Sequence, residues 1–374
     1  MVAWVDEFAG VAFLCVPELK NVFAGDYART TLWVFTVPQV LAGIVEPPLM
    51  VWAAAQPRAR KLWVAGGLSV MGAAYLTLAC VSHPGWFAAW SALAFVGSGI
   101  GVNLAQASLV DAAPGRRAPL MVRWTLLGAL GDLATPCLLA VFAWASLSYR
   151  YGFAVAGGLT IALAVLLLTQ RFPGAVVADD APALQHQPWL VVRHAPVLGW
   201  LLLASLCSLL DEVFFAFAAL HMAEVWQLPP SQRSALLTLV ALASAVGLFI
   251  AERALARGAS ARAWLLGSSA TTAFALLTWV LAPAGWVSAL ALVCVGAAAA
   301  PLWPLVKAQA FAALPQQAAA VEAASSVLGW VELLFPVLLG WAADQVGIEM
   351  ALLLLMIQPL AVLWSALRMA VVPG

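Results

Sequence analysis

The sequence predicts an all-α polytopic membrane protein with twelve transmembrane helices, and composition and pattern carry that prediction. Hydrophobic residues make up 64% of the 374 residues, charged residues make up only 9%, and the mean hydropathy is +0.99. Such a composition excludes an ordinary soluble domain. Apolar runs of about 20 residues, the length that spans a bilayer, recur along the whole chain. The runs are continuous, whereas strands of a membrane barrel alternate polar and apolar residues, so we expect helices.

Short interruptions separate the apolar runs and leave no room for a folded aqueous domain. One interruption is longer: residues 171–195 carry Pro173, Gly174, Pro182 and an Asp pair, a composition that breaks helices and stays in water. The expected spans are residues 3–23, 31–54, 62–81, 86–109, 119–144, 152–169, 196–222, 234–251, 263–281, 286–311, 318–342 and 348–370.

The chain repeats itself on either side of the long interruption. Asp6-Glu7 and Asp211-Glu212 are the same acidic pair, 205 positions apart (211 minus 6). Asp132 is matched by Glu332, 200 positions later (332 minus 132). Six spans followed by six equivalent spans indicate a parallel duplication into two pseudo-symmetric six-helix bundles. The predicted domains are an N-terminal half (residues 1–170), a cytoplasmic linker (171–195) and a C-terminal half (196–374).

Basic residues gather on one side of the predicted membrane, which sets the orientation. The loops of that side carry Arg58, Arg60, Lys61, Arg116, Arg117, Arg171, Arg193, Arg253, Arg257, Arg262 and Arg368. The opposite side carries Lys20, Arg29, Arg150 and Arg233. We therefore expect both termini in the cytoplasm, in a bacterial inner membrane.

Acidic side chains inside apolar spans are the first candidates for function, because a carboxylate in a bilayer costs roughly 2.5–3.5 kcal/mol at a helix centre. Partial desolvation in a cavity also brings proton binding by a carboxylate toward neutral pH. Asp132 and Glu332 lie about 13 residues into their spans, near mid-membrane at about 1.5 Å per residue. Adjacent acids point about 100° apart on a helix, so we expect one acid of the pair Asp211-Glu212, with Asp211 favoured, to face the cavity and the other to face a neighbouring helix. The proton-coupling candidates are Asp211, Asp132, Glu332, Asp6, Glu7, Glu212 and Glu46. The alternative is that these acids accept hydrogen bonds and fix helix packing.

Other polar and aromatic side chains inside spans are candidates for the substrate cavity. The runs GSGIGVN at 97–103 and PLWPLVK at 301–307 hold corresponding positions in spans four and ten, and interrupted helices in matching places indicate a binding site. Lys307 and Glu322 lie at matched depth on either side of a turn, which favours an ion pair, although Lys307 is also able to bind an anionic substrate. The cavity candidates are Asn103, Gln106, Arg123, Trp303, Lys307, Trp330 and His221.

The sequence resembles the major facilitator superfamily over essentially its whole length. The family's loop motif, G-x3-D-R-x-G-R-K/R, is matched after span eight in GLFIAERALARG by Gly247, Glu252, Arg253, Arg257 and Gly258, with one extra residue before the acid. The loop after span two keeps Arg58, Arg60 and Lys61, with alanine at the acidic position. In span five, Gly128, Gly131 and Pro136 match the family's antiporter signature in part, because Thr135 stands where a glycine is expected. The resemblance implies alternating access and, through span five, export by antiport.

These patterns predict a secondary transporter, coupled to protons, that exports a small amphiphilic or cationic organic solute. No Walker A motif occurs, so we expect an ion gradient to be the energy source. No HExxH or GxSxG motif occurs either, so we expect neither an enzyme nor a bound cofactor or metal. The expected partners are a small-molecule solute, protons and the lipid bilayer, with no nucleic acid, and the expected state is a monomer. A lipid flippase, or a membrane assembly protein that does not transport, is the alternative on the same fold.

Overall fold

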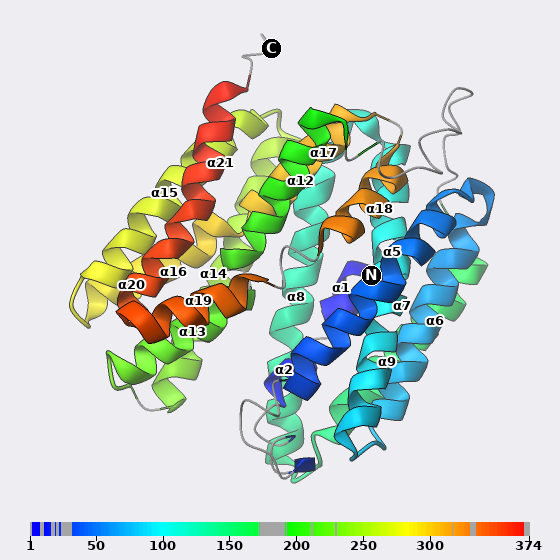
Figure 1. Ribbon diagram of the computed structural model, residues 1–374, viewed down its shortest axis with the longest axis horizontal. Coiled ribbons are helices and arrows are strands. Elements are labelled where there is room, and N and C mark those ends of the chain that lie inside the picture. Colours follow the sequence, from blue (N-terminus) through cyan, green and yellow to red (C-terminus); the bar gives the residue numbers. More distant parts are fainter. Residues whose placement is uncertain are drawn as a thin grey trace. The chain divides into compact units, whose positions relative to one another are not determined.

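The computed structural model describes most of the chain, and the described part is helical. The described residues are 2–7, 11–15, 19, 22–23, 32–170, 172, 191, 193–210, 212–228, 230–315, 317–329 and 334–369. Helices and turns account for all regular structure within these ranges, and no strand occurs in them (Figure 1). The prediction of an all-α polytopic membrane protein is confirmed.

Nine helical stretches within the described ranges are long and apolar enough to cross a membrane, and each coincides with one of the twelve expected spans. The expected span 119–144 is a single helix, α8 (Arg117–Trp144). The remaining two, 3–23 and 318–342, include residues outside the described ranges. The full count of twelve therefore stays a prediction.

Two compact units divide the chain, and neither is one continuous stretch. Unit 1 comprises Met1–Gly115, Leu127–Val197 and Leu314–Gly329, and unit 2 comprises Arg116–Leu126, Leu198–Ala313 and Trp330–Gly374. Residues 314–329 thus pack with unit 1 although the chain before and after them belongs to unit 2. The duplication into halves 1–170 and 196–374 remains a prediction about the chain.

Unit 1 is built mainly from the first half of the chain. Its principal helices are α1 (Val2–Asp6), α2 (Val11–Leu14), the π-helical turn η2 (Leu32–Thr36), α5 (Val37–Ala54), the 3-10 turn η3 (Pro57–Ala59), α6 (Arg60–Leu78), α7 (Pro84–Ala112), the greater part of α8, α9 (Arg150–Thr169) and α18 (Ala318–Leu328). Helix α6 packs on α7 and α9, and α18 packs on α5 and α7.

Glycines bring the helices of unit 1 into backbone contact. A Cβ added to Gly67 of α6 would lie 2.7 Å from the amide nitrogen of Gly101 and 2.7 Å from the carbonyl oxygen of Gly97, both on α7. Small residues at such positions allow spans to approach closely, which strengthens van der Waals packing between helices in lipid. The expectation that the run 97–103 interrupts its span is wrong: α7 is continuous through it, because its glycines serve packing.

Unit 2 holds most of the second half of the chain. Its principal helices are most of α12 (Ala195–Cys207), the 3-10 turn η5 (Ser208–Leu210), α13 (Glu212–Glu224), α14 (Pro230–Ala256), α15 (Ala261–Leu281), α16 (Trp286–Ala299), α17 (Leu302–Ala313), α19 (Leu334–Val346), α20 (Ile348–Leu353), the 3-10 turn η7 (Leu354–Met356) and α21 (Ile357–Arg368). Span ten is interrupted as expected, between α16 and α17 at Ala300-Pro301. Proline lacks the N–H that would continue the hydrogen-bond ladder.

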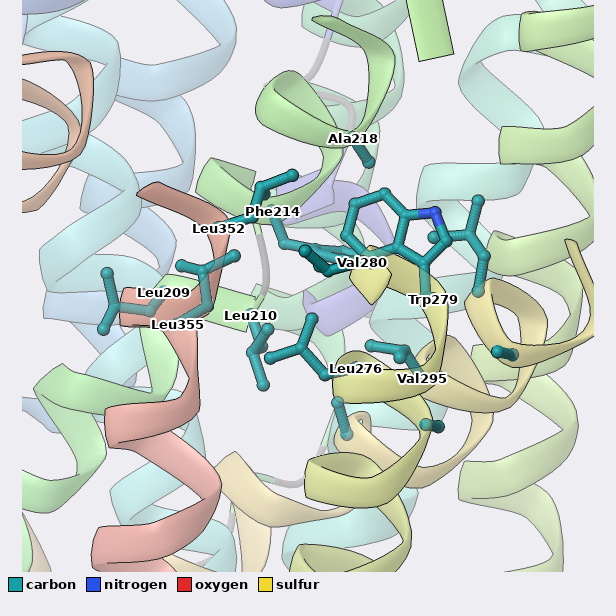
Figure 2. Close-up of a cluster of buried hydrophobic side chains, with 14 of the residues drawn as sticks. Leu209, Leu210, Phe214, Ala218, Leu276, Trp279, Val280, Val295, Leu352 and Leu355 are labelled. Atoms are coloured by element: carbon teal, nitrogen blue, oxygen red, sulfur yellow. The ribbon is translucent and has the colours of Figure 1, made fainter. Parts of the chain in front are cut away.

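Trp279 is the largest side chain in the apolar core of unit 2 (Figure 2). Its indole is 0% exposed and meets the Phe214 ring edge-on, with centroids 5.5 Å apart. Leu276, Val295 and Leu352 belong to the same buried cluster. These residues come from α13, α15, α16 and α20, so the cluster joins helices that are distant in sequence.

A basic side chain at the start of a helix binds the end of another helix in each unit. Lys61 Nζ donates to the carbonyl oxygens of Leu168 (2.7 Å) and Gln170 (2.8 Å), at the end of α9. Arg262 Nε donates to the carbonyl oxygen of Ala366 (3.0 Å), at the end of α21. Lys61 and Arg262 are 201 positions apart (262 minus 61). The two units therefore repeat one helix cap, in which a cation satisfies terminal carbonyls and the helix dipole.

Candidate functional site

The acidic pair at the start of the chain reaches two different helices of unit 1. Asp6, the last residue of α1, accepts a hydrogen bond from the hydroxyl of Ser98 on α7. The Glu7 carboxylate lies over Gly128 of α8, where an added Cβ would be 3.0 Å from Glu7 Oε1. Adjacent acids on a helix point in different directions, and here each one meets its own neighbouring span.

The glycines of span five hold α1 close to α8. A Cβ added to Gly131 would overlap the carbonyl oxygen of Trp4 and lie 3.0 Å from Glu7 Cβ. Asp132 follows Gly128 by one helical turn, and its side chain is exposed near the middle of the 28-residue helix α8. Gly128 and Gly131 match the antiporter signature in the sequence. In the structure, α1 and the Glu7 carboxylate pack against these two glycines.

Glu46 contacts two helices from the middle of α5. Its Oε1 accepts a hydrogen bond of 2.9 Å from Ser326 Oγ of α18, 280 positions away in sequence. The carboxylate occupies the space beside Gly99 of α7, where an added Cβ would overlap it. Pro47 and Pro48 follow inside the same helix and remove two backbone donors. The acid thus joins α5, α7 and α18.

Asn103 and Gln106, two of the cavity candidates, continue the face of α7 that carries Gly99. They follow Gly99 at i+4 and i+7, which places them on one side of the helix. Asn103 is half-buried and Gln106 is buried. Asn103 and Gln106 thus place two amide side chains on the face of α7 that Glu46 meets at Gly99.

A buried ion pair in unit 1 caps α18. Arg60 Nη1 lies 2.7 Å from Asp111 Oδ2, and both side chains are 2% exposed. Asp111 Oδ1 accepts a hydrogen bond of 3.2 Å from the backbone N–H of Ala318, the first residue of α18. A carboxylate at a helix N-terminus satisfies a free N–H and the positive end of the helix dipole. Arg60, predicted as part of the loop motif, is therefore one member of a three-part contact.

The remaining residues of the loop motif lie at helix ends. Arg58 is exposed on η3, and Lys61 caps α9. In unit 2, Glu252 Oε2 lies 3.8 Å from Arg253 Nε at the end of α14, with the Arg253 side chain 61% exposed. Arg257 is exposed directly after that helix.

Gly258 ends the loop motif in a conformation that favours glycine. Its φ is +94°, in the left-handed region, where a residue without Cβ has no steric penalty. Its N–H donates to the carbonyl oxygen of Leu255 at 3.0 Å, and the N–H of Ala259 donates to that of Ala254 at 3.0 Å. The glycine of the motif therefore closes α14 with bonds of the kind that commonly end helices.

Lys307 lies in an aromatic environment in unit 2. Its side chain is 4% exposed, and its ammonium lies 5.8 Å from the Trp303 ring centre and 5.9 Å from that of Phe311, one turn away on either side along α17. Such positions stabilise a buried cation through the ring quadrupoles. Glu322 is buried in unit 1, so the Lys307–Glu322 pairing stays a prediction.

His221 lies inside the apolar part of unit 2. It is 1% exposed, and its ring contacts those of Trp226 (centroids 5.6 Å apart) and Trp279 (5.0 Å). In the described part of the chain neither of its ring nitrogens has a hydrogen-bond partner. Arg123, on the stretch of α8 that belongs to unit 2, is exposed.

Several predicted site residues lie outside the described part of the chain. They are Asp211, Glu332 and Trp330, together with the side chain of Glu212, of which only the backbone is described. Their roles stay predictions. Within the described ranges no group of three or more metal-ligating side chains occurs.

Three residues that make contacts at the candidate site were not predicted from the sequence. Asp111 was not singled out, although it is the one acid of the otherwise apolar segment 84–112 and that signal is visible in the sequence. Ser98 and Ser326 were not singled out either, and nothing local marks them. Their importance comes from the acids that face them.

The chain has an all-helical membrane fold with carboxylates between its spans, and such acids commonly mark substrate or ion pathways in transport proteins. The chain belongs to the major facilitator superfamily, because the profile of the Major Facilitator Superfamily matches residues 16–218, more than half of the chain. It is a transporter of that family rather than an enzyme. No curated protein sequence matches it significantly.

Solved transporters share the fold at low sequence identity. The E. coli fucose:proton symporter FucP superposes with a TM-score of 0.73 at 13% identity, over 98% of this chain and 96% of that chain. The proton:xylose symporter XylE, also from E. coli, gives 0.73 at 14% identity, over 97% and 94%. The human organic anion transporter MFSD10 gives 0.66 at 16% identity, over 98% and 97%. At these identities the likeness establishes the fold.

Proposed function

We propose that the protein couples proton movement to the export of a small amphiphilic or cationic organic solute by alternating access. The observation that carries the proposal is the placement of the acids on α1: Asp6 is bound to α7 through Ser98, and Glu7 is seated on α8 over Gly128. Proton uptake by either acid changes a contact between α1 and another span. Proton binding is thereby linked to helix packing, which is what coupling requires.

Asp132 extends the acidic site along α8. It lies one turn beyond Gly128, and its side chain is exposed. Acids that line a transport pathway attract positive charge, which supports a cationic solute. Two of the structurally similar proteins are named as proton symporters. Symport is a property of those proteins and is not part of the proposal for this chain. The likeness of span five to the antiporter signature supports export. The inner membrane, cytoplasmic termini and a monomeric state belong to the same proposal.

The test uses proteoliposomes that contain trapped pyranine and an imposed pH gradient. Pools of small organic solutes, including the cation tetraphenylphosphonium, are added while internal pH is recorded. A solute-dependent proton signal in the wild type, lost in Asp6→Asn and Asp132→Asn, is expected. Glu349→Gln, which neutralises an exposed acid on α20, is the matched control and should keep the signal. Vesicles that give no proton signal but move labelled lipid would instead support the lipid flippase.

A further inference from the structure

Helix α18 is fastened to unit 1 by a carboxylate near each of its ends. At its first residue, Asp111 accepts the hydrogen bond from Ala318 N–H. Eight positions later, Glu46 accepts the hydrogen bond from Ser326 Oγ (326 minus 318). Asp111 is paired with Arg60 at 2.7 Å in a buried ion pair. At Glu46 the group that donates to Oε1 is a neutral hydroxyl, that of Ser326.

Gly99 gives the Glu46 carboxylate its place. A methyl group at position 99 would overlap the carboxyl carbon and both carboxyl oxygens of Glu46, so the carboxylate fills the space that glycine leaves. Gly97 and Gly101, by contrast, face the backbone of α6. Gly99 therefore has a different task from the packing glycines beside it: it lets the acid reach Ser326.

We propose that Glu46 is a proton-operated anchor for α18, positioned by Gly99. When Glu46 is ionised, the Ser326 hydroxyl donates to a full negative charge, and such hydrogen bonds are roughly twice as strong as neutral ones. When Glu46 takes up a proton, this contact weakens and α18 separates more readily from α5 and α7. The proposal rests on proton-coupled transport and names the contact through which a proton changes helix packing.

Charged groups on the helices packed around this site bear on its pH dependence. Helix α7 carries Asp111 at its end, α18 carries Glu322 one turn before Ser326, and α1 places Asp6 against Ser98, next to Gly99. Arg60 and Lys61 begin α6 and are engaged by Asp111 and by the end of α9. The test therefore compares variants of Glu46 itself with variants of Ser326 and Gly99, which carry no charge.

The experiment is hydrogen–deuterium exchange of the full-length protein in nanodiscs, read on peptides that cover α18 and corrected for the chemical exchange rate at each pH. It needs no solute. In the wild type, protection of α18 should fall about tenfold between pH 8 and pH 5, the change expected for loss of a charge-assisted hydrogen bond. Glu46→Gln should show low protection at both pH values, and so should Ser326→Ala. Gly99→Ala should behave like Glu46→Gln.

Two control variants match the test variants. Glu349→Gln, the control for Glu46→Gln, removes an exposed carboxylate on α20. Gly158→Ala, the control for Gly99→Ala, adds a methyl group to α9 at a position with no atom of a neighbouring helix within 4 Å. Both should keep the wild-type pH response. Since Ser326→Ala removes a single oxygen, it also keeps the test valid should Gly99→Ala fail to fold.

The outcomes separate the anchor from the proposed function. A wild-type protection that does not change with pH, or a pH response that survives in Glu46→Gln, overturns the anchor even where proton-driven transport is intact. A pH response that Glu46→Gln abolishes, in a protein that moves no protons in vesicles, upholds the anchor and overturns the proposed coupling.

Discussion

The buried pair of Arg60 and Asp111 offers the most direct test of how unit 1 is held together. Arg60 begins α6, where a cation faces the positive end of the helix dipole and is unfavourable by itself. Its pairing with Asp111 at 2.7 Å, with both side chains 2% exposed, offsets that cost. Removing one member of a buried pair costs about 3–5 kcal/mol, because the other charge stays buried without its partner.

Asp111→Leu should therefore lower the free energy of unfolding by about 4–6 kcal/mol, since it also removes the cap on Ala318, which contributes about 1 kcal/mol. Arg60→Leu should lower it by about 3–5 kcal/mol. In the double variant no unpaired charge remains, so the loss should shrink to about 1–2 kcal/mol, mainly the lost cap. The measurement is unfolding in sodium dodecyl sulfate, followed by far-UV circular dichroism. Additive losses in the double variant would refute the reasoning.

Three further predictions concern packing and helix ends. Trp279→Ala should lower the free energy of unfolding by about 3–5 kcal/mol, because the indole is fully buried. Trp286→Ala, at a side chain that is 79% exposed, should change it by less than about 1 kcal/mol. Unfolding in detergent measures both values. Lys61→Ala and Arg262→Ala should each lower the free energy of unfolding by about 1 kcal/mol, because each removes an equivalent helix cap. Lys61→Arg should keep the melting temperature of the wild type. Unequal losses of stability in the two alanine variants would contradict the equivalence of the two caps. Gly131→Ala should lower the free energy of unfolding by about 1–3 kcal/mol, because the added methyl group meets the Trp4 carbonyl. Gly158→Ala, with open space around it, should be neutral or stabilising by up to about 1 kcal/mol in the same detergent unfolding experiment.

The helices were predictable because their cause is local. A run of apolar residues in lipid satisfies its backbone hydrogen bonds only as a helix, whatever lies beside it. Nine expected spans are confirmed on that ground. The span-ten interruption at Pro301 was also predicted, because proline removes a backbone donor, yet α5 continues through Pro47 and Pro48. The same reasoning failed at 97–103, where glycine weakens a helix alone but strengthens it against a close neighbour.

The candidate site was predictable only in its acids. Asp6, Glu7 and Glu46 are conspicuous in an apolar chain, since each carries a solvation cost that needs an explanation. Their partners are not conspicuous. Ser98 and Ser326 are two serines among many, and no local feature distinguishes Gly99 from its neighbours.

By itself, the sequence determined that the chain is a helical membrane protein, where most of its spans lie and which intramembrane acids require partners. Only the tertiary structure decided that Asp111 caps α18, that Ser326 reaches Glu46 across 280 positions, and that residues 314–329 pack with unit 1. The physical reason is range. Hydropathy acts on each segment separately, whereas a hydrogen bond between distant segments exists only once helix packing has brought its two atoms within about 3 Å.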